Sequence, residues 1–335
     1  MARKTILPVA AAAAWLALAP ADVAAQERAL VQRCSLLATS SSVISPNAVR
    51  FCNMVAQAIE IAQPVVGFAA AGGNPVPGTA STLGMRLGAL PRLSLAGRAT
   101  GVFADLPPIL DFDDRREIGI FVPSLNVDGA IGIMSGWSLA PTVGGVGSLD
   151  GLLSIGVLPL PGGEDGFRDS PWTVGGGLRL GILRESFTMP GISVTGMYRR
   201  VGGFTFGDRD LARDDSSFEM DMGIWSLRGT VGKRIMFLGL TLGAAYDHYS
   251  SDVEFAFRDP EGLAATPIRI RYDDFENDRF ALFGNVSWTV LILSLVAEVG
   301  WQSGADAVPG ALPANVDFDA EGSRFFGSLA LRLSI

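Results

Sequence analysis

One pair of side chains in this sequence has the residue types and the spacing for hydrolytic chemistry. His248, the single histidine of the chain, stands two residues before Ser250 in a segment that alternates apolar and polar residues. Residues i and i+2 of a strand share a face, so the two side chains are expected on the same side. A serine nucleophile with a histidine base needs a third polar group to orient the imidazole. Glu276, on the expected opposing strand, is the candidate for that role.

The surroundings of this pair favour a structural interpretation. Tyr246 and Tyr249 lie on either side of His248, which is an ordinary composition for the aromatic band of a membrane protein at the water interface. A His-x-Ser pair on the outside of a barrel resembles outer-membrane phospholipases and lipid A deacylases. The flanking Asp247 and Ser251 do not match the phospholipase pattern, and a two-residue motif is a weak signal. We therefore expect no enzyme, and keep the lipid hydrolase as an alternative.

Other chemistry has little support in the composition. Two cysteines and one histidine offer few soft metal ligands, so we expect no cofactor and no metal site. The acidic runs 111–114, 208–215 and 273–274 have the oxygen ligands that divalent cations prefer. Such runs are usually solvated loops. The net charge of −8 offers no electrostatic footprint for nucleic acid.

Residues 1–25 have the pattern of a secretory signal peptide. Arg3 and Lys4 precede an apolar run from Ile6 to Leu18, and small residues then offer a cleavage site before Gln26. The alternative, an uncleaved membrane anchor, needs a longer apolar run. The pattern predicts export of the rest of the chain into a bacterial periplasm, and from there insertion into the outer membrane.

Residues 26–78 are predicted to form a helical plug. The stretch from Glu27 to Leu37 has helical periodicity, and Ser45-Pro46 is a typical helix start, with serine as N-cap and proline in the first turn. Cys34 and Cys52 are predicted to form a disulfide in an oxidising compartment. The bridge would tie two short helices into a hairpin.

From residue 79 onward, segments of alternating polarity follow one another. In the last one, Leu329, Leu331 and Leu333 point to one side while Arg332 and Ser334 point to the other. An outer-membrane barrel places such an apolar face against lipid and the polar face in the lumen, whereas a soluble sheet needs a covering layer. The same alternation recurs in 92–103, 126–137, 172–182, 191–199, 217–232, 236–250, 278–290 and 294–302.

This pattern predicts an all-β fold, a transmembrane antiparallel up-and-down β-barrel over residues 79–335. Short connections alternate with long ones, as in barrels whose short turns face the periplasm. If 62–71 and 79–88 are strands, the barrel has about 12 strands, with about 10 to 14 compatible. After residue 25 we expect no apolar run of transmembrane-helix length, although the mean hydropathy is +0.33. A phase change near Ile224 predicts a β-bulge. A soluble β-sandwich is the alternative fold.

Charged residues of the opposite parity are predicted to line the lumen. They are Arg92, Arg98, Asp128, Arg179, Arg199, Arg228, Arg279, Glu298 and Arg332. Glu219 and Asp221 are expected to point inward as well. A lumen with both signs of charge can hold water and substrate, or can be closed by arginine–carboxylate pairs, and the sequence leaves both open.

The residues before the first strands resemble those of the FadL-type outer-membrane transporters for hydrophobic compounds. The elements that carry the resemblance are Ala71-Gly72-Gly73-Asn74-Pro75 and Ala80-Ser81-Thr82. The resemblance implies an amino-terminal hatch inside a 14-stranded barrel. The order of these elements is reversed here, and the cysteine pair is not part of the family pattern, so no binding residues are carried over.

We expect a porin-like passive channel or transporter for small molecules, hydrophobic ones included. The alternatives are a closed structural or adhesive barrel and the lipid hydrolase. The expected partners are outer-membrane lipid, lipopolysaccharide and, through the apolar carboxy-terminal strand, the barrel-insertion machinery. Nothing in the sequence indicates an oligomeric state.

Overall fold

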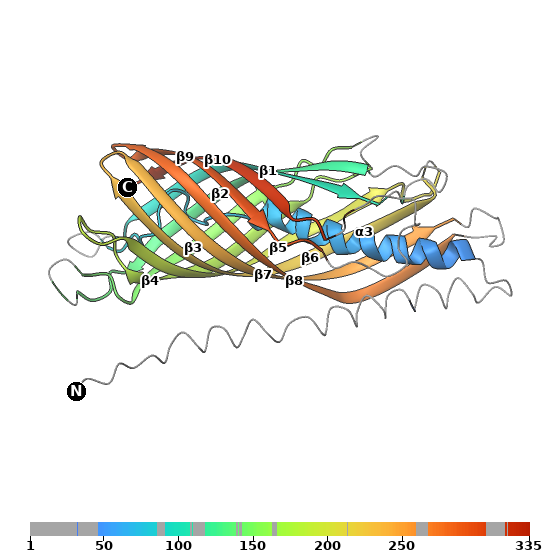
Figure 1. Cartoon of the computed structure of the whole chain (residues 1–335), viewed down its shortest axis with the longest axis horizontal. Coiled ribbons are helices and arrows are strands. Elements are labelled where there is room, and N and C mark those ends of the chain that lie inside the picture. The colour runs from blue at the N-terminus through green and yellow to red at the C-terminus, as the bar shows by residue number, and fades with distance from the viewer. Residues whose placement is uncertain are drawn as a thin grey trace, which may run out of the picture.

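The chain forms a closed antiparallel β-barrel around one helix (Figure 1). This computed structural model describes residues 32, 46–85, 91–107, 109, 118–138, 140, 143–162, 166–212, 214–258, 267–305, 319 and 321–335, with only the backbone of 46–51. The helix, α3, spans Pro46–Ala71. The strands are β1 (Leu93–Leu106), β2 (Ile118–Met134), β3 (Ser148–Val157), β4 (Trp172–Leu183), β5 (Gly191–Gly207), β6 (Ser216–Ile235), β7 (Leu238–Phe257), β8 (Ile268–Val290), β9 (Leu293–Gln302) and β10 (Arg324–Ser334).

The predicted fold class is confirmed, but the barrel has ten strands in the described part of the chain. Residues 62–71 belong to α3. In 79–85 the backbone bonds to side chains of the wall: the amide of Leu83, for example, donates to the Asp150 carboxylate at 3.0 Å. No edge is left for further strands, because β1 pairs with both β2 and β10. The barrel is therefore also smaller than the 14 strands that the FadL-type resemblance implies.

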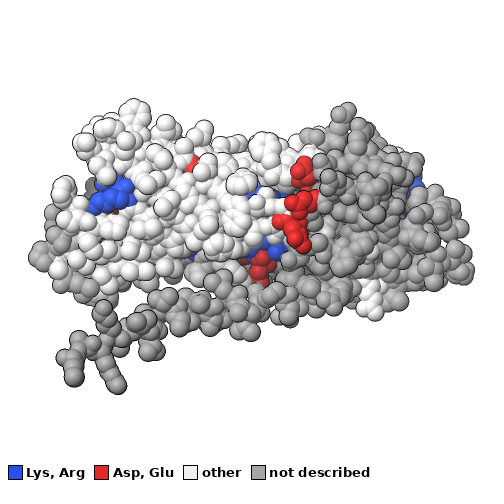
Figure 2. All heavy atoms as spheres, viewed as in Figure 1, with Lys and Arg blue, Asp and Glu red and all other residues white. Residues whose placement is uncertain are grey.

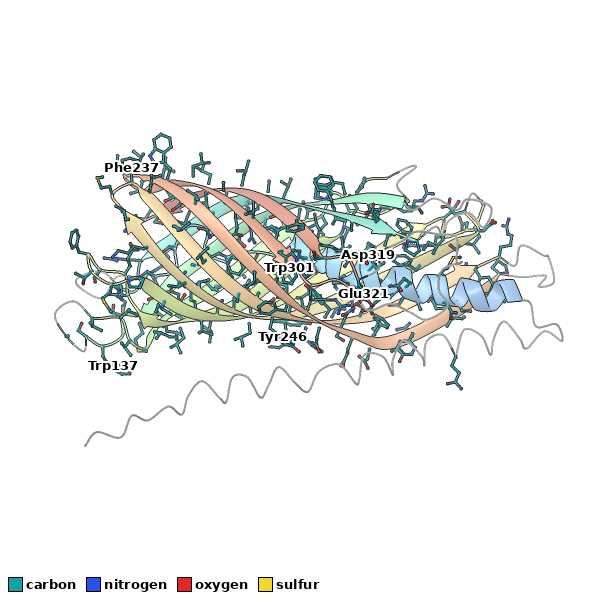
Figure 3. All side chains as sticks on the ribbon, viewed as in Figure 1. Trp137, Phe237, Tyr246, Trp301, Asp319 and Glu321 are labelled. Atoms are coloured by element: carbon teal, nitrogen blue, oxygen red, sulfur yellow. The ribbon has the colours of Figure 1, made fainter. Side chains whose placement is uncertain are left out.

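A broad apolar band covers the outside of the barrel. On β7, Leu238, Leu240 and Leu242 are each about half exposed. In Figure 3 this band extends from Trp137 and Phe237 at the short-turn end to Tyr246 and Trp301. Figure 2 shows the same surface almost without charged side chains, bordered by acidic groups on the side away from the short turns. An apolar outward band with aromatic borders is how a barrel meets lipid.

Beyond this band, the barrel wall reverses its polarity. The outward side chains of β7 become polar at His248 and continue with Asp252 and Glu254, while Val253 and Phe255 turn inward and are buried. The membrane-spanning part of β7 therefore ends at Tyr246. We call the side of the band away from the short turns the upper side. Above the band in this sense, water lies outside the wall and an apolar core lies inside.

The predicted β-bulge near Ile224 is wrong for the same reason. Burial alternates without a break from Phe218 to Val231 of β6, with Met220 and Met222 inside and Glu219 and Asp221 outside. The strand does not change its register. Apolar residues move from the outward to the inward positions because the surroundings of the wall change from lipid to water. The register irregularity lies in β5, between Val201 and Phe204.

Helix α3 runs lengthwise inside the barrel, with its first residues at the end opposite the carboxy terminus (Figure 1). Its segment Cys52–Ala71 is long and apolar enough to cross a membrane, which corrects the expectation that no such run follows residue 25. All of it is buried inside the barrel instead. The predicted start at Pro46 is confirmed. The helix ends before Gly73, whose φ of 81° favours glycine and is typical of a helix C-terminus.

The location of the membrane boundary on β7 predicts two different responses to one substitution. We expect Leu242→Arg to reduce the free energy of unfolding by about 2–4 kcal/mol, because it places a charge in the lipid-facing band. Ser250→Arg, on the same face above the band, should cost less than about 1 kcal/mol. Urea unfolding in lipid vesicles measures both values, and equal costs would contradict the boundary.

Candidate functional site

The upper part of the lumen is an apolar sleeve around α3. The helix side chains Val55, Ile59 and Val66 join one buried cluster with inward residues such as Val102 and Phe255. Phe68 meets Phe326 of β10 edge to face, with ring centroids 4.7 Å apart. Burying a large apolar side chain stabilises a fold by about 1.5–3 kcal/mol. The sleeve therefore holds the helix firmly.

Close approach of helix and wall depends on Gly67. A Cβ atom at this position would lie 2.2 Å from Cε1 of Tyr249, which is fully buried against the helix. The Tyr249 hydroxyl in turn accepts a hydrogen bond from Gln302 Nε2 at 2.8 Å. The glycine thus makes room for an aromatic ring that is fixed by a second strand.

A proline and a carboxylate fix the register of the helix in the barrel. Pro64 has no N–H group, so it cannot bond the carbonyl of Glu60 one turn earlier. Asn277 Nδ2 lies 3.4 Å from that carbonyl oxygen and 2.8 Å from Glu60 Oε1. Arg279 forms an ion pair with the same carboxylate. Both members of this pair are buried, so each depends on the other.

Further polar contacts continue along α3 toward its end. Gln63 Nε2 donates to Ser251 Oγ at 2.6 Å and to a wall carbonyl. The last turn of a helix leaves carbonyls without helical partners. Here Ser124 Oγ donates to the carbonyl of Ala69 at 2.6 Å, and just beyond the helix Arg98 Nη1 donates to that of Gly72 at 2.8 Å. The barrel wall therefore caps the helix.

Residues 72–85, the descending segment, run from the end of α3 toward the short turns and pass charged side chains of the lower lumen. The Asn74 amide donates to Glu298, and Arg332 donates to the carbonyl of Pro77. Arg179 Nη2 donates to the carbonyl of Ser81 at 2.9 Å. Charged groups that are sequestered from water need such partners.

The predicted lumen-lining residues can now be placed. Arg98, Asp128, Arg179, Arg199, Arg228, Arg279, Glu298 and Arg332 are buried, whereas Arg92 is exposed at the short-turn mouth. Direct pairs join Arg98 to Asp128 at 3.2 Å, Arg179 to Asp150 at 2.7 Å and Arg228 to Asp247 at 3.0 Å. These contacts favour the closed interpretation of the lumen.

Two features of the lumen were not foreseen. Glu60 was missed, although it is the one charged residue in Cys52–Ala71 and so stands out in an apolar helix. The three guanidinium nitrogens of buried Arg199 have no hydrogen-bond partner among the described residues. The predicted Cys34–Cys52 disulfide stays a prediction, because Cys34 lies outside the described residues, as does most of the helical stretch from Glu27 to Leu37.

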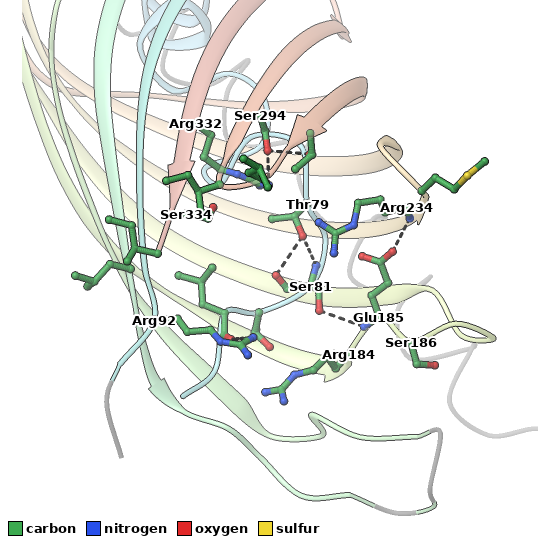
Figure 4. Close-up of a pocket in the computed structure, with 18 of the residues that line it drawn as sticks. Thr79, Ser81, Arg92, Arg184, Glu185, Ser186, Arg234, Ser294, Arg332 and Ser334 are labelled. Atoms are coloured by element: carbon green, nitrogen blue, oxygen red, sulfur yellow. Dashed lines mark hydrogen bonds between the residues drawn. The ribbon is translucent and has the colours of Figure 1, made fainter. Parts of the chain in front are cut away.

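A vestibule of about 730 Å³ opens at the short-turn mouth (Figure 4). Four arginines from different parts of the chain surround it, with Thr79 and Ser81 of the descending segment between them. They are Arg92, Arg184, Arg234 and Arg332. This is the polar end of the lumen.

The candidate hydrolytic residues lie on the outer face of the wall. His248 Nδ1 is 2.8 Å from Asp278 Oδ1, so the group that orients the imidazole is Asp278 rather than the expected Glu276. Glu276 instead lies opposite Ser250 in the strand register. No hydrogen bond joins His248 to Ser250 in the described part of the chain. The observed contact orients the imidazole without engaging the serine.

No protein-family model and no curated protein matches this sequence. Among solved structures, the outer membrane protease OmpT from Escherichia coli is similar at a TM-score of 0.36 and 13% identity, over 73% of this chain and 96% of that chain. The translocator domain of the autotransporter NalP from Neisseria meningitidis gives 0.40 and 11%, over 72% and 87%. The transport unit of the autotransporter AIDA-I from Escherichia coli gives 0.35 and 8%, over 82% and 99%. These likenesses concern the fold alone, that of an outer-membrane β-barrel.

The Asp278 contact predicts a measurable titration of His248, which lies above the apolar band. The hydrogen bond to Asp278 raises the pKa of the imidazole above its ordinary value, against the opposing effect of burial. Stability from this pair is thus present at low pH, down to where Asp278 itself takes up a proton, and is lost as the pH rises through the raised pKa. Because the chain has one histidine, NMR titration in micelles is unambiguous. Asp278→Asn should return the pKa toward about 6.5, whereas an unchanged pKa would contradict the assignment.

Proposed function

We propose that this protein is a closed outer-membrane barrel that holds its own amino-terminal chain across the membrane and presents the residues before Pro46 at the cell surface. The observation that supports this most is the complete burial of Cys52–Ala71 inside the apolar sleeve. A closed structural or adhesive barrel thereby becomes the preferred function, ahead of a passive channel.

The direction of the chain supports surface presentation. Short turns of outer-membrane barrels face the periplasm and long loops face outward. The descending segment reaches Arg332, which lies near the short turns, through Pro77. Gln63 contacts Ser251, which lies above the apolar band. The amino-terminal end of α3 therefore faces the outside of the cell.

The energetics support a closed lumen. Withdrawal of α3 would expose its apolar side chains and would also leave Arg279 without its buried partner. Breaking a buried ion pair alone costs about 3–5 kcal/mol. The partners that fit this proposal are the lipids around the apolar band and, through β10, the machinery that inserts barrels.

Surface presentation predicts the accessibility of an epitope tag. A tag placed after Gln26 should be bound by antibody on intact cells. A tag placed between Ser186 and Phe187, in the turn between β4 and β5, should be bound only after the outer membrane is permeabilised. Detection of the first tag only in permeabilised cells would contradict the proposal.

A passive channel is the second candidate, favoured by the polar lower lumen and the vestibule at its mouth. Conduction would require α3 to leave the sleeve, so the two candidates differ in the state of the helix. The wild-type protein should be closed in planar bilayers if the first proposal holds.

Single-channel recording of a destabilised plug tests this difference. Glu60→Arg places like charges beside Arg279 and should produce openings that the wild type lacks. Asp273→Arg is the matched control, since it makes the same charge change in an exposed ion pair with Arg271. Steady conductance of the wild-type protein would favour the channel instead.

A further inference from the structure

The four arginines of the vestibule have little opposing charge. Among the described residues that line the cavity, Glu185 is the one with a carboxylate side chain, and it accepts a hydrogen bond from the backbone amide of Arg234. The chain end at Ile335 lines the cavity as well. None of the four arginines forms an ion pair with a carboxylate in the described part of the chain. This differs from the lumen above, where arginines and carboxylates are mostly paired.

Two donor groups of the vestibule arginines have no acceptor in the described part of the protein. Nε of Arg184 and Nε of Arg332 are buried without hydrogen-bond partners among the described residues. Burial lowers the pKa of the Arg184 guanidinium, the nearby Arg92 lowers it further, and Asp150 opposes both effects. Buried donors without partners point to a missing acceptor.

We propose that this vestibule binds a phosphate group. Guanidinium groups present paired N–H donors that match the oxygens of a phosphate, and they do so best when several converge. The four guanidinium groups outnumber the carboxylates that line the cavity, which suits a group with more than one negative charge. Hydroxyls of Thr79, Ser81 and Ser294 line the same cavity and offer neutral hydrogen bonds. This site is independent of surface presentation by α3.

The rim of the vestibule allows two sources of that group. The short turns around it carry apolar side chains in the open: Phe187 is 99% exposed, Leu291 94% and Met236 83%. Exposed apolar side chains in these turns suit contact with the periplasmic surface of the outer membrane, where phospholipid head groups lie. The phosphate can therefore belong to a phospholipid or to a solute of the periplasm.

The first test uses the full chain in dodecyl maltoside micelles with inorganic phosphate as the probe. Isothermal titration should give saturable binding for the wild type. In the Arg92→Gln/Arg234→Gln variant, the affinity should fall at least about tenfold, as expected for the loss of charge-assisted hydrogen bonds. The matched control is Arg269→Gln/Arg271→Gln, which removes two exposed arginines at the other end of the barrel and should bind like the wild type.

The second test uses vesicles of phosphatidylcholine with or without phosphatidylglycerol. Native mass spectrometry should detect phosphatidylglycerol retained by the wild type and the control, and less on the vestibule variant. If phosphatidylglycerol is retained but inorganic phosphate does not bind, the phosphate group belongs to a lipid. If inorganic phosphate binds but phosphatidylglycerol is not retained, the phosphate group belongs to a solute. The absence of both, or equal binding by all three proteins, overturns the proposal. If the double variant does not fold, Arg234→Gln alone serves, since that exposed side chain makes no described hydrogen bond.

Discussion

Closure of the hydrogen-bonded ring is the constraint on which the rest of this structure depends. Each strand pairs with a neighbour on both sides, so every residue along a strand must point either outward or inward. No strand can rotate to adapt to its surroundings. The sequence must therefore supply at each level the side chains that suit the outside and the inside of the ring.

The surroundings of the wall change along its length, and the side chains follow. Lipid outside permits a polar lumen, so arginine–carboxylate pairs such as Arg228–Asp247 lie at the level of the apolar band. Above the band, water outside permits an apolar interior, which needs an apolar occupant. Strands β1, β2, β10 and the long strands β5 to β8 build this sleeve, and α3 fills it.

The helix connects the two regions. Its apolar side chains pack against the sleeve. Glu60 and the carbonyl groups at its end accept hydrogen bonds from polar side chains of the wall. The segment after it satisfies Glu298, Arg332 and Arg179 on the way down. Four arginines without a carboxylate partner among the described residues gather at the short-turn mouth, and buried Arg199 is a further unpaired arginine inside the lumen.

The sequence predicted much of this architecture from local periodicity. Alternating polarity revealed the β-barrel, Ser45-Pro46 marked the start of the helix, and parity placed Arg98, Asp128 and Arg179 on the inner face. It failed for Glu219 and Asp221, because apolar side chains were assumed to face lipid along the whole strand, and the change of phase near Ile224 was therefore interpreted as a β-bulge. It also counted too many strands, because apolar residues 62–71 suit a buried helix as well as a strand.

The sequence by itself thus determined the type of wall and the parity of most of its residues, since both follow from neighbours along the chain. Only the tertiary structure decided where lipid gives way to water, which chain fills the sleeve and which charges meet. Glu60 and Arg279 are far apart in the chain, and so are Arg92, Arg184, Arg234 and Arg332. Closure of the barrel brings the residues of each set together. Local patterns in the sequence do not predict which distant residues meet in this way.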